Sequence, residues 1–220
     1  MTVAAVILAA SAESALADAA GLARVRRIAD VAWSGGAFPI IVVAESPDGL
    51  VAAALAGAPI TLAAPAPADG GPVAQIALGI DMALGEVDDT TAALVWPARF
   101  CWAGPETVTS LIEAHGTDSA SLIRPTWLGE PGWPALLPIA VLGALRVLPA
   151  SAMPHELLEL LLSGGSVSSR GIDLGDPGAV IDGTTARELL PTYEGPAGSS
   201  GAHAYEWGEA MAAKADDAGE

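Results

Sequence analysis

The residues that follow the first buried strand are the ones whose types could bind a phosphate group. In the stretch VILAASAESALAD (residues 6–18), an apolar run leads through Ala9 and Ala10 into a turn. Many nucleotide-binding α/β proteins place glycines here, because glycine lets backbone N–H groups approach phosphate oxygens closely. This chain has Ser11 and then Glu13 in that turn. The turn could therefore be a phosphate loop, the remnant of one, or an ordinary connection between a strand and a helix.

The thiol and imidazole groups offer weaker candidates for chemistry. Cys101 follows a predicted strand and could be a reactive thiol, but a lone cysteine is more often a buried apolar residue. His115 lies a helix away from it, and we predict that His115 and His155 face solvent on their helices. Because the third histidine lies near the C-terminus, a metal site built from all three is not expected.

The charge balance limits the kinds of partner. The chain has 26 acidic and 9 basic residues and a formal net charge of −17, so it lacks the positive surface that nucleic acids and anionic membranes require. No apolar run predicts a membrane span, and no basic segment precedes one as in a signal peptide. The single cysteine excludes an intramolecular disulfide and fits the reducing cytoplasm. The only lysine, Lys214, lies near the C-terminus, which argues against a mechanism that needs a lysine in the main domain.

Apolar runs and helical periodicities alternate along the chain and predict the elements that would position these residues. Buried strands are predicted at 3–10, 38–44 and 93–98, and further strands at 59–63 and 121–127. Helices are predicted at 21–33, 47–56, 73–84, 104–116, 138–148, 154–162 and 184–190. This alternation is typical of an α/β protein with three α/β/α layers and a mostly parallel sheet. We expect one domain over residues 1–194, followed by an acidic flexible tail over 195–220.

Five stretches in a fixed order resemble the MobA-like NTP transferases, a family that includes the nucleotidyltransferases of the molybdenum cofactor. They are AAVILAA (4–10), GPVAQIALGI (71–80), ALVWPARFCWAGPETVTSLIEAH (93–115), GEPGWPALLP (129–138) and DPGAVIDGTTAREL (176–189). The resemblance implies a Rossmann-like fold of the nucleotide-diphospho-sugar transferase type. It also implies transfer of a nucleotide from an NTP, with Mg²⁺ as the cofactor.

The first loop departs from the family pattern of glycine, serine, arginine and a second glycine, followed by basic residues. The corresponding residues here are Ser11, Glu13, Ala15, Ala17 and Asp18. The resemblance places a remnant nucleotide site at Ala9, Ala10 and Ser11. We expect Glu13 to repel a triphosphate there, because no cation in the loop offsets its charge.

The metal position departs from the family pattern as well. The family's aspartate after the central strand corresponds to Arg99, and a cation cannot be a ligand of Mg²⁺. The closing Asp-x-Asp motif keeps only its first carboxylate, Asp182, as a candidate metal ligand. Arg99 could bind an anionic ligand or pair with Asp182 or Asp176, and the ion pair is favoured because an isolated buried charge is costly. An active enzyme would need a rearranged magnesium site around Asp173, Asp176 and Asp182.

Two tryptophans complete the remnant site with Arg99. Under the resemblance, Trp102 and Trp133 lie on loops around the substrate, and Trp133 replaces a histidine of the family. They could stack on a planar ligand such as a nucleotide base, a pterin or a flavin. Alternatively, the indoles fill a cleft that no longer holds a nucleotide, or they are core residues, as we expect for Trp96.

These departures favour a diverged family member with weakened or lost NTP transfer. We expect it to act as a binding or accessory protein in cofactor metabolism, such as that of the molybdenum cofactor. One alternative is an active nucleotidyltransferase with a rearranged magnesium site. Another is an interaction module that docks a protein partner through Tyr205, Trp207 and Met211 in the segment 203–211.

Overall fold

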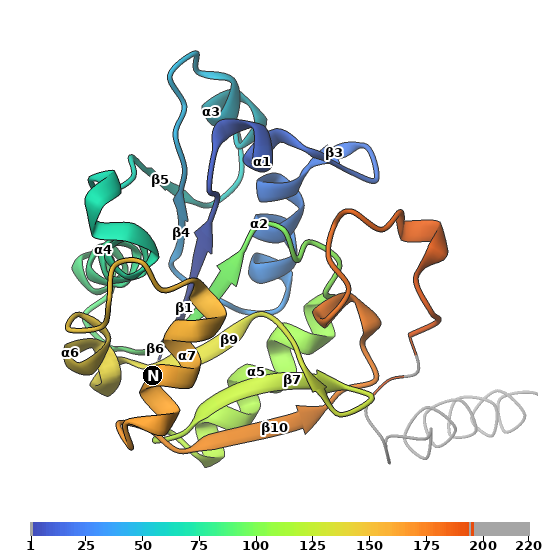
Figure 1. Cartoon of the computed structure of the whole chain (residues 1–220). Coiled ribbons are helices and arrows are strands. Elements are labelled where there is room, and N and C mark those ends of the chain that lie inside the picture. The colour runs from blue at the N-terminus through green and yellow to red at the C-terminus, as the bar shows by residue number, and fades with distance from the viewer. Residues whose placement is uncertain (1, 194, 196–220) are drawn as a thin grey trace, which may run out of the picture.

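One mixed sheet forms the centre of the protein in a computed structural model, which describes residues 2–193 and residue 195 (Figure 1). The strand order is β10-β7-β9-β6-β1-β4-β5, and β8 pairs with β7. The strands are β1 (Thr2–Leu8), β4 (Ile40–Val43), β5 (Thr61–Ala63), β6 (Thr90–Pro97), β7 (Leu122–Trp127), β8 (Glu130–Pro131), β9 (Ala135–Pro138) and β10 (Ser169–Asp173). Strands β1, β4, β5 and β6 are parallel neighbours, as are β7 and β10, whereas β9 runs antiparallel to β6 and β7.

Helices cover both faces of the sheet and make the three layers. Helices α2 (Arg24–Ser34) and α5 (Pro105–Thr117) contact each other on one face. Helices α4 (Gly71–Glu86), α6 (Leu142–Leu145) and α7 (Pro154–Ser163) contact each other on the opposite face. The short helices α1 (Ala12–Leu16) and α3 (Leu50–Ala54) follow β1 and β4. The predicted α/β/α fold class is confirmed.

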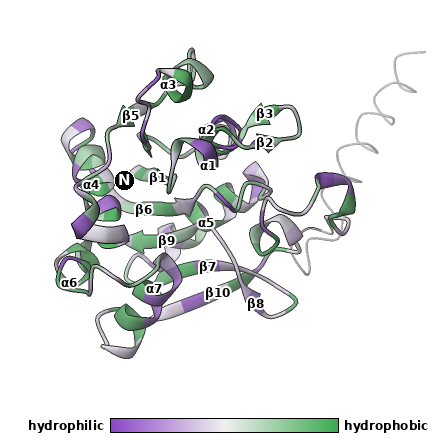
Figure 2. Ribbon diagram, turned by 45° about the horizontal axis from the view of Figure 1, so that its top comes forward, coloured by the Kyte–Doolittle hydropathy of each residue, from purple (hydrophilic) through white to green (hydrophobic). Residues whose placement is uncertain are grey.

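The central strands are hydrophobic on both faces because each face packs against helices. Along β1, Ala5 and Ile7 belong to the core under α2 and α5, whereas Ala4 and Val6 belong to the core under α4. All four are fully buried. Figure 2 shows this pattern as green ribbon on the inner strands β6 and β9. A strand buried on both sides has a continuous apolar sequence rather than an alternating one, and that is the signal in the sequence.

Three segments differ from the predicted elements. Residues 18–23 form a small hairpin of β2 (Asp18–Ala19) and β3 (Leu22–Ala23), so α2 begins later than predicted. The predicted helix 138–148 is split into a 3₁₀ turn at 139–141 and the short α6, and it follows the unpredicted strand β9. The predicted closing helix is only a 3₁₀ turn at 187–189. These segments are short, and tertiary contacts rather than periodicity determine their structure.

The C-terminal part of the chain is described as far as residue 193, and again at Gly195. The predicted docking segment 203–211 therefore lies outside the described residues. No helix among the described residues combines the length and apolarity that a bilayer-spanning segment needs.

Candidate functional site

A serine in the turn after β1 caps the helix that follows. Ser11 is the N-cap of α1, and its hydroxyl accepts a hydrogen bond from the backbone N–H of Ser14 at 3.1 Å. Glu13 lies in the first turn of α1, where a carboxylate is favoured by the helix dipole. Ala15, at the position of the family's arginine, is fully buried. The structure therefore has the features of an ordinary strand-to-helix turn, with an acid at the position where a phosphate would approach.

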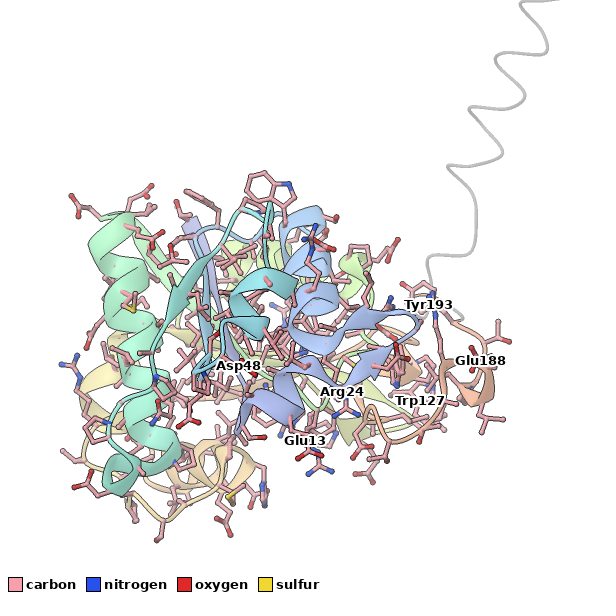
Figure 3. The ribbon with its side chains drawn as sticks, turned by 90° about the horizontal axis from the view of Figure 1, so that it is seen from above. Glu13, Arg24, Asp48, Trp127, Glu188 and Tyr193 are labelled. Atoms are coloured by element: carbon pink, nitrogen blue, oxygen red, sulfur yellow. The ribbon has the colours of Figure 1, made fainter. Side chains whose placement is uncertain are left out.

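The neighbouring loop adds negative charge to the same edge of the sheet. Strand β4 is parallel to β1, and it is followed by the exposed residues Glu45 and Asp48. Asp48 accepts a hydrogen bond from the backbone N–H of Leu50 at the start of α3, which contacts α1. Figure 3 labels Glu13 on α1 and Asp48 in the turn that precedes α3. The loops at the carboxyl ends of β1 and β4 therefore carry several acidic side chains.

Arg99 and Asp182 form the ion pair that the sequence favoured. The Arg99 guanidinium donates to the Asp182 carboxylate, and the backbone N–H of Gly183 donates to the carbonyl oxygen of Arg99 at 2.6 Å. Asp182 also accepts hydrogen bonds from the backbone N–H and the hydroxyl of Thr184. Burial raises the pKa of Asp182, but the hydrogen bonds from Thr184 and Arg99 outweigh it and bring the pKa to about 2. The carboxylate is therefore charged, and both of its oxygens already accept hydrogen bonds.

The other two aspartates do not join Asp182 in a metal site. Asp176 is buried and accepts three hydrogen bonds, from the backbone N–H groups of Gly104 and Gly178 and from the hydroxyl of Thr107. Asp173 is exposed and accepts from the backbone N–H of Gly175.

The donor set around these aspartates therefore does not fit a divalent cation. Among residues 2–193, no three carboxylate, imidazole or thiol groups are arranged to hold a metal ion. The described residues therefore give no support to the alternative of a rearranged magnesium site around Asp173, Asp176 and Asp182. In place of a metal ion, Asp182 has a guanidinium beside it, and Asp176 binds the N-terminal turn of α5.

The two tryptophans of the predicted remnant site belong to different cores. Trp102 packs in the core under α2 and α5, and its indole N–H donates to the carbonyl oxygen of Thr185 at 3.0 Å. Trp133 packs in the core under α4 and α7 and stacks on Phe100, with ring centroids 6.0 Å apart. Only 7% of Trp102 and 4% of Trp133 is exposed.

Packing therefore accounts for both indoles, which agrees with the alternative in which they fill space in the protein rather than stack on a ligand. The guanidinium of Arg124 lies 5.3 Å from the ring centroid of Trp133 and donates to the carbonyl oxygens of Gly132 and Pro131. Burial lowers the pKa of Arg124. Trp96 is fully buried, as predicted.

The thiol and imidazole predictions have different outcomes. Cys101 is buried, as expected of a lone cysteine, and burial raises the pKa of its thiol. His155 is exposed as predicted, but the prediction that His115 faces solvent is wrong. His115 is fully buried against β6, where its Nε2 lies 3.1 Å from the hydroxyl of Thr91. Its position late in α5 places it on the helix face that packs on the sheet.

The predicted site residues thus lie in different surroundings, the loops at the carboxyl ends of two neighbouring strands and the two cores. Ala9, Ala10 and Ser11 follow β1, and Arg99 follows β6, the parallel neighbour of β1. A groove of about 480 Å³ lies elsewhere, between α4 and the segment that follows α6, and it includes Val73, Leu78 and the ion pair Asp81–Arg146. Sequence reasoning missed the arginines of α2, which contact the loop after β6 and the segment after β10.

Comparison with known proteins identifies the family. The family model described as the MobA-like NTP transferase domain matches residues 6–165. A search of the curated proteins found no match to the sequence.

Solved structures of low sequence identity have the same fold. The manganese complex of Rv0371c from Mycobacterium tuberculosis H37Rv has 16% identity and a TM-score of 0.62, over 79% of this chain and 89% of that chain. A nucleotidyl transferase from Methanothermobacter thermautotrophicus has 18% identity and a TM-score of 0.63, over 78% and 87% of the two chains. A CMP:2-keto-3-deoxy-manno-octonic acid synthetase with CTP bound has 14% identity and a TM-score of 0.55, over 97% and 99%.

Proposed function

We propose a binding or accessory role, with weakened or lost NTP transfer, for this chain. The premise is that the chain belongs to the MobA-like NTP transferase family. The observation that carries the proposal is the ion pair between Arg99 and Asp182. In ordinary nucleotidyl transfer, carboxylates at strand ends hold a divalent cation that neutralises the phosphates. Here the cation beside Asp182 is a side chain, which supplies one positive charge and no coordination site for a phosphate oxygen.

The first loop supports the same proposal. Transfer from a triphosphate needs backbone N–H groups and cations that grip the phosphates. The hydroxyl of Ser11 takes one first-turn N–H of α1, and Glu13 places a negative charge at that helix end. The loop therefore lacks the glycine-rich backbone with which an active enzyme of the family would bind the phosphates.

The ligand of this proposal is a nucleotide or another planar cofactor, bound without a metal-dependent reaction. The family and the CTP complex of one structural neighbour support a nucleotide. The family resemblance supports a place in cofactor metabolism, such as that of the molybdenum cofactor. The single cysteine supports the cytoplasm as the location.

The proposal is tested by thermal unfolding with CTP, GTP and ATP, each alone, with Mg²⁺ and with Mn²⁺. We expect any stabilisation by a nucleotide to be the same with and without the divalent cation. A parallel series with a pterin and a flavin tests the planar-cofactor form of the proposal.

The variants Asp182→Asn and Asp173→Asn make the test specific. A metal-dependent shift that disappears in Asp182→Asn but persists in Asp173→Asn would show an active metal site and overturn the proposal. Stabilisation by none of these ligands would overturn the small-molecule binding role.

A further inference from the structure

A small groove lies between α2 and the first residue of α5. It has a volume of about 140 Å³ and is lined by Leu22, Arg27, Asp30, Val31, Ser34 and Pro105. Leu22 is 45% exposed, although it is a large apolar residue. The groove is smaller than pockets that enclose a drug-sized ligand, so it suits one or two side chains of a peptide.

The groove offers a positive charge beside its apolar surface. The Nε of Arg27 donates to the carbonyl oxygen of Cys101 at 2.9 Å, and the Arg27 guanidinium lies 5.2 Å from the ring centroid of Trp102. Among residues 2–193, no carboxylate lies within ion-pair distance of Arg27. The one acid of the groove, Asp30, is paired with Arg26. A carboxylate that entered the groove would therefore find a guanidinium without an ionic partner.

The described chain ends close to this groove. A Cβ on Gly175 would lie 2.1 Å from the carbonyl oxygen of Gly195, so these two residues are in contact. The next residue, Asp176, accepts a hydrogen bond from the backbone N–H of Gly104 at 3.0 Å. Gly104 directly precedes Pro105, which lines the groove. A short series of neighbours thus leads from the last described residue to the groove.

The docking segment 203–211 (HAYEWGEAM) has the complementary composition. It contains the large apolar residues Tyr205, Trp207 and Met211, together with glutamates and no lysine or arginine. Residues 196–202 connect it to the last described residue, and an extended connection of this length spans up to about 25 Å. The docking segment can therefore reach the groove from the end of the described chain.

We propose that the docking segment 203–211 binds the groove between α2 and α5 of its own chain. Its apolar side chains cover Leu22, Val31 and Pro105, and one of its glutamates pairs with Arg27. The short connection gives an effective concentration in the millimolar range, so weak contacts are enough to keep the segment bound. The groove includes none of the residues of the remnant nucleotide site, so this proposal does not depend on the proposed function.

The test is oxidation of methionine by hydrogen peroxide, followed in the full-length chain by mass spectrometry. Met211 lies in the docking segment, and Met153, which is 53% exposed, is an internal reference. Leu22→Asp places a carboxylate in the groove, and this variant should fold like the parent because Leu22 is exposed. We expect Met211 to be oxidised about three to ten times faster in Leu22→Asp than in the parent, with Met153 unchanged.

Two further variants make the test specific. The control Val147→Asp adds the same charge at a position that is 82% exposed and lies outside the groove, so Met211 should be oxidised at the parent rate. The double variant Glu206→Gln and Glu209→Gln should raise that rate, because the guanidinium in the groove then loses its carboxylate partner.

Three results would show that the proposal is wrong. The first is an equal rate of Met211 oxidation in the groove variant and in its control. The second is an unchanged rate in the double glutamine variant. The third is a rate that rises when the protein is diluted, because the segment would then bind a second copy of the chain instead of its own.

Discussion

His115 is a buried imidazole with one nitrogen left without a partner. Its Nε2 lies beside the hydroxyl of Thr91, and its Nδ1 has no hydrogen-bond partner in the described residues. Burial lowers the pKa of His115 from its usual 6.5, and Asp118 opposes this shift only in part. The folded protein therefore holds the imidazole in its neutral form.

This burial predicts a loss of stability in mild acid. The free energy of unfolding should be highest above pH 6.5 and fall as the pH drops below it, because the unfolded chain takes up the proton first. In His115→Gln, which cannot titrate, thermal melts between pH 5 and 7 should show a flatter dependence. The control His155→Gln, at an exposed position, should keep the parent slope. Equal slopes in all three proteins would contradict the prediction.

The pair Arg99–Asp182 matters for the site rather than for stability. The Arg99 side chain is 63% exposed and that of Asp182 17% exposed, and pairs of this kind contribute on the order of 0–1 kcal/mol. Their effect is on ligand binding, because a guanidinium and a carboxylate that bind each other are less available to bind a ligand.

Among the elements, α4 approaches β1 at a glycine. A Cβ on Gly79 would lie 2.3 Å from Cγ1 of Val6, so only glycine fits in this contact. The same helix contains Gly85, which is exposed and has open space around it. The glycine that resembles a family residue is therefore required for packing of the helix on the sheet.

Alanine substitution should separate these two glycines. Gly79→Ala should lower the free energy of unfolding by about 1–3 kcal/mol through overpacking. Gly85→Ala should leave it unchanged or raise it by up to ~1 kcal/mol, because alanine favours the helix. Urea unfolding measures both. A loss of the same size in both variants would show that helix propensity, not the contact with Val6, determines the result.

Asp176 links the segment after β10 to the N-terminus of α5. We expect Asp176→Ala to cost about 2–4 kcal/mol of unfolding free energy, because the buried donors on Thr107 and Gly178 and the partly buried one on Gly104 lose their acceptor. The exposed Asp173→Ala should cost less than about 1 kcal/mol. Chemical denaturation measures both. Similar losses would mean that Asp176 has no special structural role.

At the scale of the whole molecule, the net charge of −17 opposes compaction. Raising NaCl from about 20 mM to about 500 mM shortens the Debye length several-fold and should raise the melting temperature. A variant with Glu86→Gln and Glu113→Gln, two exposed acids, should melt higher at low salt and respond less to NaCl. A melting temperature that does not change with salt would contradict this account.

The sequence by itself determined the layered fold. Runs such as those of β1, β4 and β6 are apolar on both faces, and α5 begins at a proline beside an acid, so local pattern and burial agree. The residues of β1, β6 and α5 also carried the resemblance, and the family model confirms the family over residues 6–165. The sequence also showed that Ser11 stands where the family has a glycine and that Arg99 stands where the family has an aspartate.

Only the tertiary structure decided how the side chains are paired. Arg99 and Asp182 are 83 residues apart, and the chemistry of each could have served a ligand instead. The partners of Asp176 and the burial of His115 depend on how α5 packs on the sheet. Periodicity indicates which face of an element is apolar, but it does not indicate which polar groups of distant elements contact each other.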